Sequence, residues 1–336
     1  MTSVSGVSAA DHSSAAPGPG PLSGDGASTG RLGDRVFGGA ARGAGLLVIT
    51  LVVLIGAFLV SQAVPALAKD HVNFLTSSEW SVDGDVLKFG IANLLWVTVL
   101  SSAIALLVAV PLGVGVALFI TQYAPRWLSR PAASLVDLLA AVPSIVYGLW
   151  GLWVFGSHLT GIQHVLRSAL GWFPLFTPTA VSEGGNIFVV GIVLAIMVLP
   201  IVTALSREVF AQTPVSHKEG ALALGATRWE MIRTAVLPFG RPGVISASML
   251  ALGRALGETV AVLIILSVLS DGSPWSWSMF SGGETFASKI ANNAAEFDSP
   301  QKAGAFIAAG LVLFILTFVV NAIARIVIER RKAFTE

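Results

Sequence analysis

Residues 43–67, GAGLLVITLVVLIGAFLVSQAVPAL, form an uninterrupted apolar stretch without a single charged side chain. About 20 residues of α-helix are needed to cross the hydrocarbon core of a bilayer, which is roughly 30 Å thick. The stretch is therefore predicted to be a membrane-spanning helix. Because it is longer than the apolar core of a cleavable signal peptide, we expect it to be retained as an anchor.

The rest of the chain repeats this pattern. Of its 336 residues, 54% are apolar and 12% are charged, with a mean hydropathy of +0.79, whereas soluble domains carry about 25% charged residues. The predicted fold class is all-α, a polytopic membrane protein with six transmembrane helices. The predicted helices are about 43–67, 91–120, 134–155, 186–206, 244–269 and 303–324, and Pro111, Pro143 and Pro200 inside three of them are interpreted as packing kinks.

The positive charges between these helices predict the orientation, because cytoplasmic loops are enriched in Lys and Arg. With the N-terminus inside, the inner segments carry 14 of the 20 Lys and Arg residues, the outer loops carry 5, and Arg254 lies within the fifth helix. Both termini are therefore expected in the cytoplasm.

The N-terminal residues 1–42 are rich in Ser, Gly, Ala and Pro and show no apolar period. Such a composition cannot bury enough apolar surface to offset the entropy of ordering, so a disordered cytoplasmic tail is predicted. A transmembrane domain is expected at 43–332, and its longest cytoplasmic segment at 208–242.

The cytoplasmic segment contains two signals for helix starts. SHKE at 216–219 and TRWE at 227–230 are each predicted to form a capping box, in which the first hydroxyl accepts an N3 amide and the Glu reaches back. Gly225 is expected to close the first helix in a left-handed conformation, and the second helix is expected to stop near Leu237-Pro238. Two short helices joined by a sharp turn indicate a docking element that carries force to a cytoplasmic partner. The simpler interpretation is an ordinary connecting loop.

The same segment carries a family resemblance. Glu219-Gly220-Ala221, followed by Gly225 and by Leu237-Pro238, resembles the EAA motif of ABC-importer permeases. In this chain Gly220 replaces the usual second alanine. The residues that the resemblance and the caps assign to coupling with an ATPase are Ser216, Glu219, Gly220, Ala221, Gly225, Thr227, Leu237 and Pro238.

Two longer stretches of sequence indicate which group of permeases the chain resembles. Residues 218–262, including GRALGE at 253–258, together with AAVPSIVYGLWGLWVF at 140–155, are similar to the phosphate-importer permeases. The sequence ASKIANNAA at 287–295 resembles the corresponding sequence of PstC-type subunits more than that of their PstA-type partners. The similarity extends over about residues 35–332.

The resemblance implies a type I ABC-importer permease fold and a function in moving inorganic phosphate across a bacterial plasma (inner) membrane. It also implies the partners: a PstA-type permease subunit, a dimer of ATPase subunits and an extracytoplasmic phosphate-binding protein. ATP and Mg would be bound by the ATPase, so this chain would be a transport subunit without an enzymatic activity of its own. In an alternating-access mechanism, the motion of the ATPase subunits would reach the membrane helices through the coupling segment.

Intramembrane charge marks the expected substrate path. Arg254 lies about ten residues into the predicted fifth helix, roughly 15 Å at 1.5 Å per residue, and so near the midplane. Glu258 would follow at i+4 on the same face. Either ion is costly to bury alone, so a structural ion pair is one interpretation, and a guanidinium fork for phosphate oxygens is the other. Asp137 is expected in the first turn of the third helix, where the helix dipole stabilises a carboxylate.

Other functions are weighed against this one. The chain has no cysteine and no G-x-x-x-x-G-K-[ST] sequence, so a thiol chemistry and a P-loop within this chain are excluded. An importer permease for another oxyanion, such as sulfate or molybdate, would share every feature except the GRALGE-type helix. An ATP-independent secondary transporter or channel belongs to a different class and would need no ATPase. An intramembrane enzyme lacks a nucleophile constellation in the helices.

Overall fold

The computed structural model describes residues 29–82, 86–179, 181, 183–270, 273, 275–297 and 299–332. The chain divides into two compact units, residues 1–54 and 55–336. Helix α1 (Thr29–Leu67) begins in the first unit and ends in the second. The predicted disordered tail is therefore wrong for residues 29–42, which continue the apolar helix, because adding residues to an existing helix costs little once it is nucleated. The rest of that tail, 1–28, lies outside the described residues.

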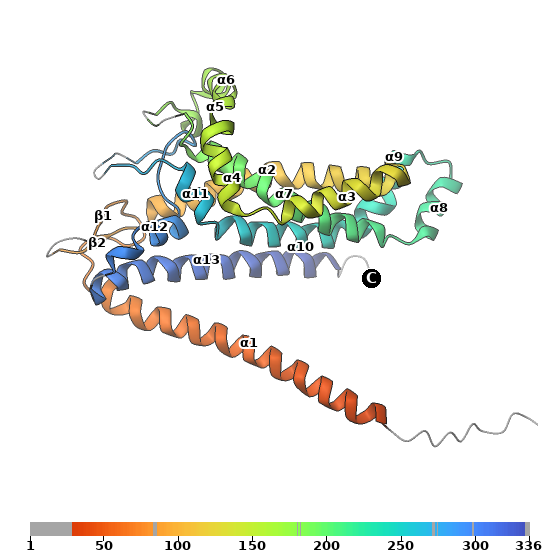
Figure 1. Cartoon of the computed structure of the whole chain (residues 1–336), viewed down its shortest axis with the longest axis horizontal. Helices are drawn as coiled ribbons and strands as arrows, with labels where there is room; N and C mark the ends of the chain where they lie inside the picture. Colours follow the sequence, from red (N-terminus) through yellow and green to blue (C-terminus); the bar gives the residue numbers. More distant parts are fainter. Residues whose placement is uncertain are drawn as a thin grey trace, which may run out of the picture. The chain divides into compact units, whose positions relative to one another are not determined.

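The centre of the second unit is a bundle of apolar helices. Helices α2 (Ala92–Leu118) and α7 (Ile187–Ala211) pack along each other, with α10 (Leu237–Leu256) against both and α13 (Pro300–Lys332) along α10 (Figure 1). The interface between α2 and α7 is built from small and β-branched side chains, among them the fully buried Ala105, Ala109 and Val193. Small residues let helices approach closely in a membrane, where dispersion replaces the hydrophobic effect as the packing force.

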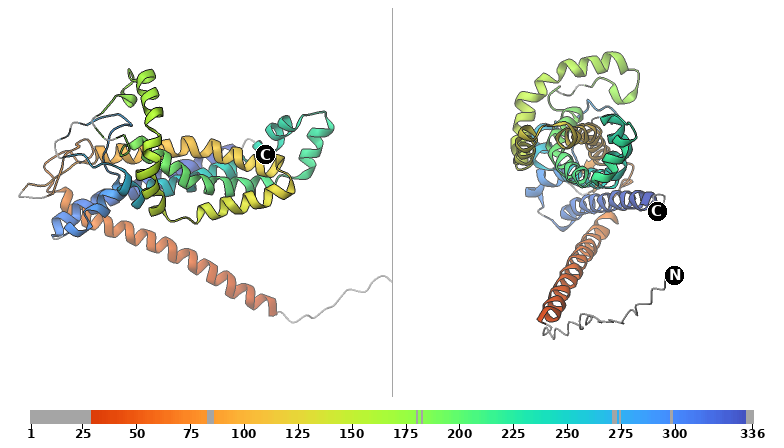
Figure 2. Two further views of the ribbon diagram at one scale, coloured as in Figure 1. Left: turned by 45° about the horizontal axis from the view of Figure 1, so that its top comes forward. Right: turned by 90° about the vertical axis from the view of Figure 1, so that its right-hand side faces the viewer.

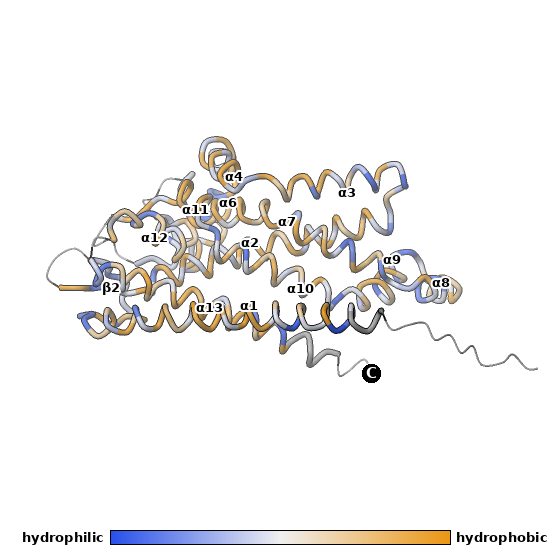
Figure 3. Tube along the Cα trace, turned by 60° about the horizontal axis from the view of Figure 1, so that its bottom comes forward, coloured by the Kyte–Doolittle hydropathy of each residue, from blue (hydrophilic) through white to orange (hydrophobic). Residues whose placement is uncertain are grey.

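Five helices of the described residues are long and apolar enough to cross a membrane, or six if a bent pair counts as one span. The described spans are Gly33–Leu67, Ala92–Tyr123, Ile187–Ala211, Arg228–Leu256 and Pro300–Ile326, and the bent pair is Arg126–Ala140 with Ser144–His158. Figure 3 shows hydrophobic residues predominating along α2, α7 and α13. An all-helical polytopic membrane fold is thereby confirmed.

The third segment is bent where a straight helix was predicted. Helix α3 (Arg126–Ala140) is followed after a short break by α4 (Ser144–Trp150), and the two are bent by 89°. Pro143 between them has an extended backbone, with ψ 140°. Proline also lacks the N–H that a continuing helix would need and disfavours the helical conformation of the residue before it. The single helix at 134–155 is therefore wrong, and Pro143 is a break.

The bent arm continues through a π turn (Gly151–Phe155), α5 (Gly156–His158) and α6 (Thr160–Leu170). In the right-hand view of Figure 2, which looks along the bundle, α6 (lime green, at the top) lies beside the bundle and runs roughly perpendicular to its length. A short 3₁₀ turn, Pro174–Phe176, then leads back to the start of α7. The connection between the bend and α7 is thus built around an ordered helix.

The fifth segment is also interrupted. Helix α10 ends at Leu256, and α11 (Val260–Ile265) begins after Gly257, Glu258 and Thr259. Gly in a helix interior costs about 1 kcal/mol relative to Ala, and the Thr259 hydroxyl donates to the Gly257 carbonyl at 3.2 Å. A continuous helix over 244–269 is therefore wrong.

The two ends of the bundle differ. One end carries α8 (Val215–Ala223), α9 (Arg228–Met231) and the π turn η4 (Ile232–Val236). The opposite end carries the two-stranded antiparallel sheet of β1 (Trp80–Ser81) and β2 (Lys88–Phe89), α12 (Phe286–Asn292) and a 3₁₀ turn at Ala294–Glu296 (Figure 1). These are called the α8 end and the α12 end below.

Candidate functional site

The break between α10 and α11 places two charged side chains close in sequence but in different surroundings. Glu258 is 9% exposed, and its Oε1 accepts the backbone N–H of Ala261 at 3.1 Å. Its carboxylate therefore satisfies one of the free amides that begin α11, where negative charge is stabilised. Glu258 is a helix cap in this structure.

Arg254 occupies the other side of the break. It lies in the last turn of α10 and is exposed on the surface of the chain. It lines a groove of about 450 Å³ together with Ile201, Met249, Leu250, Gly253 and Asn321. Ile201 stands in the middle of α7 (Ile187–Ala211), so the guanidinium lies at a central depth of the apolar bundle.

The expected pair between the two charges is not formed. No ion pair joins Arg254 and Glu258, both of which the structure describes. The i+4 geometry failed because the helix ends at Leu256 and the Glu258 carboxylate turns to the amides of α11. Arg254 is left with its guanidinium open to the groove, a costly arrangement if the groove faced lipid.

The α8 end presents an exposed apolar tip. Helix α8 buries none of its residues, and Leu224 is 91% exposed, with Leu222 and Trp229 exposed beside it. Glu219 is exposed too and forms no ion pair within the described part of the chain. Exposed apolar residues around such a carboxylate suit a surface that another protein covers.

The turn after α8 has the geometry that its glycine predicts. Gly225 has φ +84°, and a Cβ placed there would meet nothing within 4 Å. The N–H of Gly225 donates to the Leu222 carbonyl and the N–H of Ala226 donates to the Ala221 carbonyl, at 3.0 and 3.2 Å. These two bonds form a complete Schellman motif, so the left-handed closure at Gly225 is confirmed.

The second predicted capping box is present. Thr227 Oγ1 accepts the N–H of Glu230 at 3.3 Å, and Glu230 Oε2 accepts the N–H of Thr227 at 2.8 Å. The following turns are anchored in a small core in which Met231, Ile232 and Val236 pack against Ala117 and Phe210 of the neighbouring helices. The tip is therefore connected to α2 and α7 through this core.

Two details of the coupling segment were predicted wrongly. Ser216 caps nothing, because α8 already begins at Val215 after Pro214, whose rigid extended backbone sets the start two residues earlier. The second helix does not stop at Leu237-Pro238 either. It widens into the π turn η4 and continues as α10, with Pro238 at its start, where a missing N–H is tolerated.

Two polar contacts were not predicted from the sequence. Asn321 of α13 reaches the Arg254 groove, and its signal was a lone amide within an apolar helix. Asp137 lies in the last turn of α3, not the first, and accepts from Arg207 of α7 at 3.4 Å. The start of α3 at Arg126 was not predicted from hydropathy, because the first turns of the helix are polar.

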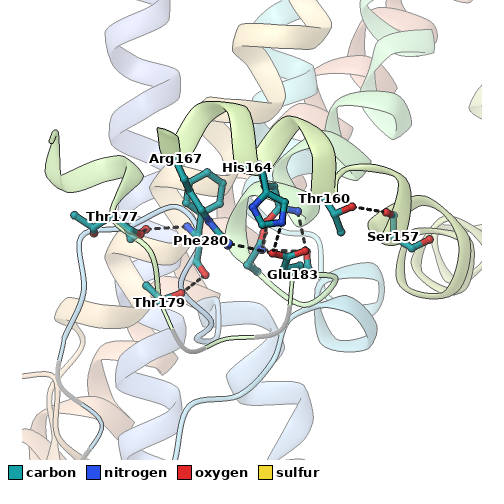
Figure 4. Close-up of polar contacts among 11 residues, drawn as sticks. Ser157, Thr160, His164, Arg167, Thr177, Thr179, Glu183 and Phe280 are labelled. Atoms are coloured by element: carbon teal, nitrogen blue, oxygen red, sulfur yellow. Dashed lines mark hydrogen bonds and ion pairs between the residues drawn. The ribbon is translucent and has the colours of Figure 1, made fainter. Parts of the chain in front are cut away.

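The α12 end holds a second polar cluster (Figure 4). Arg167 of α6 donates to Glu183 Oε1 at 3.1 Å and lies over the ring of Phe280, with its Cζ 4.6 Å from the centroid. The same Glu183 oxygen is 3.2 Å from His164 Nε2. Thr179 donates to the Phe280 carbonyl at 2.6 Å. The α6 arm is thus fastened to the segment that carries Phe280.

These features define a class: a polytopic helical permease with a charged groove at a broken helix and an exposed tip for a partner. Residues 109–333 match the family described as "Binding-protein-dependent transport system inner membrane component". The chain belongs to this family and is a permease subunit, not itself an ATPase.

Individual relatives indicate which type of permease within this family the chain resembles. The chain is 55% identical over 298 residues to the phosphate transport system permease protein PstC 2 of Mycobacterium tuberculosis, covering 88% of this chain and 91% of the relative. The protein of the same name from Mycobacterium bovis matches equally. PstC of Mycobacterium leprae is 54% identical over 295 residues, with 87% and 92% covered. The resemblance to PstC-type permeases is thereby confirmed.

One solved structure supports the fold. A bacterial ABC transporter involved in the import of the acidic polysaccharide alginate has a chain with a TM-score of 0.51 and 16% sequence identity, covering 71% of this chain and 78% of that chain. At this identity the likeness concerns the fold, which is that of an ABC-importer permease.

Proposed function

We propose that this permease subunit moves inorganic phosphate into a bacterial cell, through a path that Arg254 lines. The observation that carries the proposal is the Arg254 guanidinium in an open groove at a central depth of the bundle. A guanidinium is a planar fork of donors that matches phosphate oxygens and keeps its charge. The phosphate permeases to which the chain is similar supply the identity of the anion.

The open groove also supports a second permease subunit. A guanidinium facing lipid at this depth costs at least about 3 kcal/mol on insertion scales. The groove is therefore covered, and a PstA-type subunit is the proposed cover, so that the path runs between the two permeases. Gly253 favours such an approach, because a Cβ there would meet nothing within 4 Å and the helix surface is open.

Glu258 keeps a place in the path as a fixed cap. Its carboxylate orients the start of α11 next to Arg254, and it offers an acceptor to a protonated phosphate oxygen. Its main effect is proposed to be positional, because its oxygen already holds the Ala261 amide.

The α8 end is proposed to dock on the ATPase. In ABC transporters ATP is bound by separate ATPase subunits, and the chain works with them in its complex. The coupling residues Glu219, Gly220, Ala221 and Gly225 lie on the exposed tip, whereas Leu237 and Pro238 begin α10. Closure of an ATPase pair would move the tip, and α9 and η4 would pass the motion to α2 and α7.

The remaining partners and the setting are proposed on the same basis. The α12 end would face outward and receive an extracytoplasmic phosphate-binding protein. Both termini would lie in the cytoplasm, and the chain would span the plasma membrane.

Purification of the native complex, with identification of its subunits and its bound anion, tests these assignments. A PstA-type permease, an ATPase and phosphate are the expected components. Uptake of labelled phosphate should require ATP and resist excess sulfate or molybdate. Competition by sulfate would support the oxyanion alternative, and uptake without an ATPase would support a secondary transporter or channel.

A further inference from the structure

The segment between α11 and α12 is buried to an unusual degree for a connection at the end of a bundle. Every residue from Ser278 to Phe286 is buried. Its first part is fixed to the start of α7, where the N–H groups of Ile187 and Phe188 donate to the carbonyls of Ser281 and Met279 at 3.0 and 2.8 Å. Its last part is fixed to α2, where Thr98 Oγ1 accepts the N–H of Phe286 at 3.1 Å. The backbone is thus held at both ends.

Between these anchors lies an ion pair that is shielded from water. Lys289 Nζ is 2.8 Å from Glu284 Oε2, with side-chain exposures of 16% and 9%. Asn292 donates to the other carboxylate oxygen at 3.2 Å, and the Lys289 ammonium stands 5.7 Å from the ring centroid of Trp80. An ion pair of this kind is strong only while both partners are in place, because either charge alone would be buried without compensation.

Two cavities share part of their lining beside this pair. A cavity of about 620 Å³, lined in part by Ser78, Lys88, Asn93 and Trp275, opens at the α12 end. A small cavity of about 30 Å³ lies against Val262 and Leu263 of α11 and against Leu266, which directly follows it. Gly283 and Glu284 line both. Glu284 therefore borders both the large cavity and the small cavity beside α11, the helix that follows the Arg254 break.

We propose that Glu284, held by Lys289, is the gate of the anion path at the α12 end. With the pair formed, the two side chains close the passage from the large cavity to α11, and the Lys289 charge is compensated and so is not available to an anion. When the pair separates, Glu284 swings aside and Lys289 offers its charge to the incoming anion. The proposal rests on the proposed function, since it takes the path to run along α10 and α11.

The conformation of Gly283 agrees with a gate in which the side chains move and the backbone stays in place. It has φ +146°, a conformation that other residues rarely adopt. A Cβ there would lie 2.8 Å from Val97 Cγ2. Any larger residue would clash with Val97 of α2, so only glycine lets the segment pack this closely on α2 beside the carboxylate.

Thiol labelling tests the gate, because this chain has no native cysteine. Val262→Cys places one thiol in the small cavity, at a position that is 0% exposed. The full complex, without nucleotide or phosphate, is treated with a membrane-impermeant maleimide from the α12 side. We expect slow labelling, and labelling about tenfold faster or more when Glu284→Gln is added, the effect of losing one charged hydrogen bond. Lys289→Gln should act in the same direction.

A matched pair provides the control. Glu79 and Lys88 form an exposed ion pair at 3.2 Å beside the same large cavity, so Glu79→Gln should leave labelling of the thiol at position 262 unchanged. The exchange Glu284→Lys with Lys289→Glu should restore slow labelling. A separate Ala105→Cys variant, with its thiol buried between α2 and α7, should stay protected in every background.

Three results would overturn the gate. They are equal labelling at position 262 with and without Glu284→Gln and Lys289→Gln, an equal rise with Glu79→Gln, or a parallel rise at the control position 105. The measurement uses neither phosphate nor transport. A complex that imports another oxyanion would therefore still give the expected labelling, and the two proposals fail separately.

Discussion

Gly225 tests the docking tip at the scale of one residue. Its φ of +84° disfavours any side chain with a Cβ, by about 1 kcal/mol or more. Gly225→Val should leave the chain inserted but weaken its hold on the ATPase and reduce uptake several-fold. The measurement is co-purification of the ATPase together with ATP-driven uptake.

Gly220 supplies the matched control for that substitution. It lies on the same exposed tip, within α8, and a Cβ there would meet nothing within 4 Å. Because its backbone is helical, Gly220→Ala should preserve ATPase binding and stabilise α8 by about 0.5–1 kcal/mol. Full uptake in Gly225→Val, or equal damage from both substitutions, would contradict the role of the left-handed turn.

At the scale of the element, the capping box of α9 should keep the coupling segment rigid. Thr227→Ala removes the two hydrogen bonds that the Thr227 hydroxyl makes with Glu230 and should destabilise α9 by about 1 kcal/mol. We expect more rapid amide hydrogen exchange over 228–236 and weaker coupling of ATP hydrolysis to uptake.

Ser216 is the control for this element, because it begins no helix and its hydroxyl caps no amide. Ser216→Ala should therefore leave exchange and uptake at their normal values. A loss from Ser216→Ala as large as that from Thr227→Ala would mean that hydroxyls act here through the ATPase and not through the cap.

Elements also show where sequence reasoning succeeds. Apolar length located the spanning segments because a bilayer fixes how many residues a helix needs. Gly225 and Thr227 were predicted because a left-handed turn and a capping box depend on neighbouring residues alone. The turn and the second cap of the coupling segment were therefore predicted correctly, whereas the cap at Ser216 and the stop at Leu237-Pro238 were not.

Several of the misses were decided by tertiary contacts. Pro143 breaks its helix, whereas α2 and α7 continue through Pro111 and Pro200. The choice depends on neighbouring helices, which hydropathy does not describe. Arg254 was identified as an intramembrane charge, but its separation from Glu258 required knowledge of where α10 ends. Asn321 joined the site only through the packing of α13 against α10.

At the scale of the whole molecule, the charge asymmetry predicts the topology. Reporters fused to the N-terminus and to the C-terminus should both be accessible only from the cytoplasm. The thiol of a Leu224→Cys variant, at a position that is 91% exposed, should be labelled from that same side. Labelling of this thiol from outside the cell would reverse the orientation.

The central claim is that Arg254 lines the path by which phosphate crosses the membrane domain. One comparison of variants tests this claim most directly. ATP-driven phosphate uptake is measured in proteoliposomes that contain the full complex with wild-type chain, Arg254→Gln, Arg254→Lys or Arg241→Gln. Arg241 is the control, because it is an exposed arginine on the same helix.

We expect each variant to assemble with its partners and hydrolyse ATP. Uptake should fall at least about a hundredfold in Arg254→Gln, the effect of losing about 3 kcal/mol of charged hydrogen bonding. Arg254→Lys should recover little, because an ammonium cannot reproduce the planar fork, and Arg241→Gln should transport normally. Phosphate uptake that persists in Arg254→Gln at the wild-type rate would contradict the account.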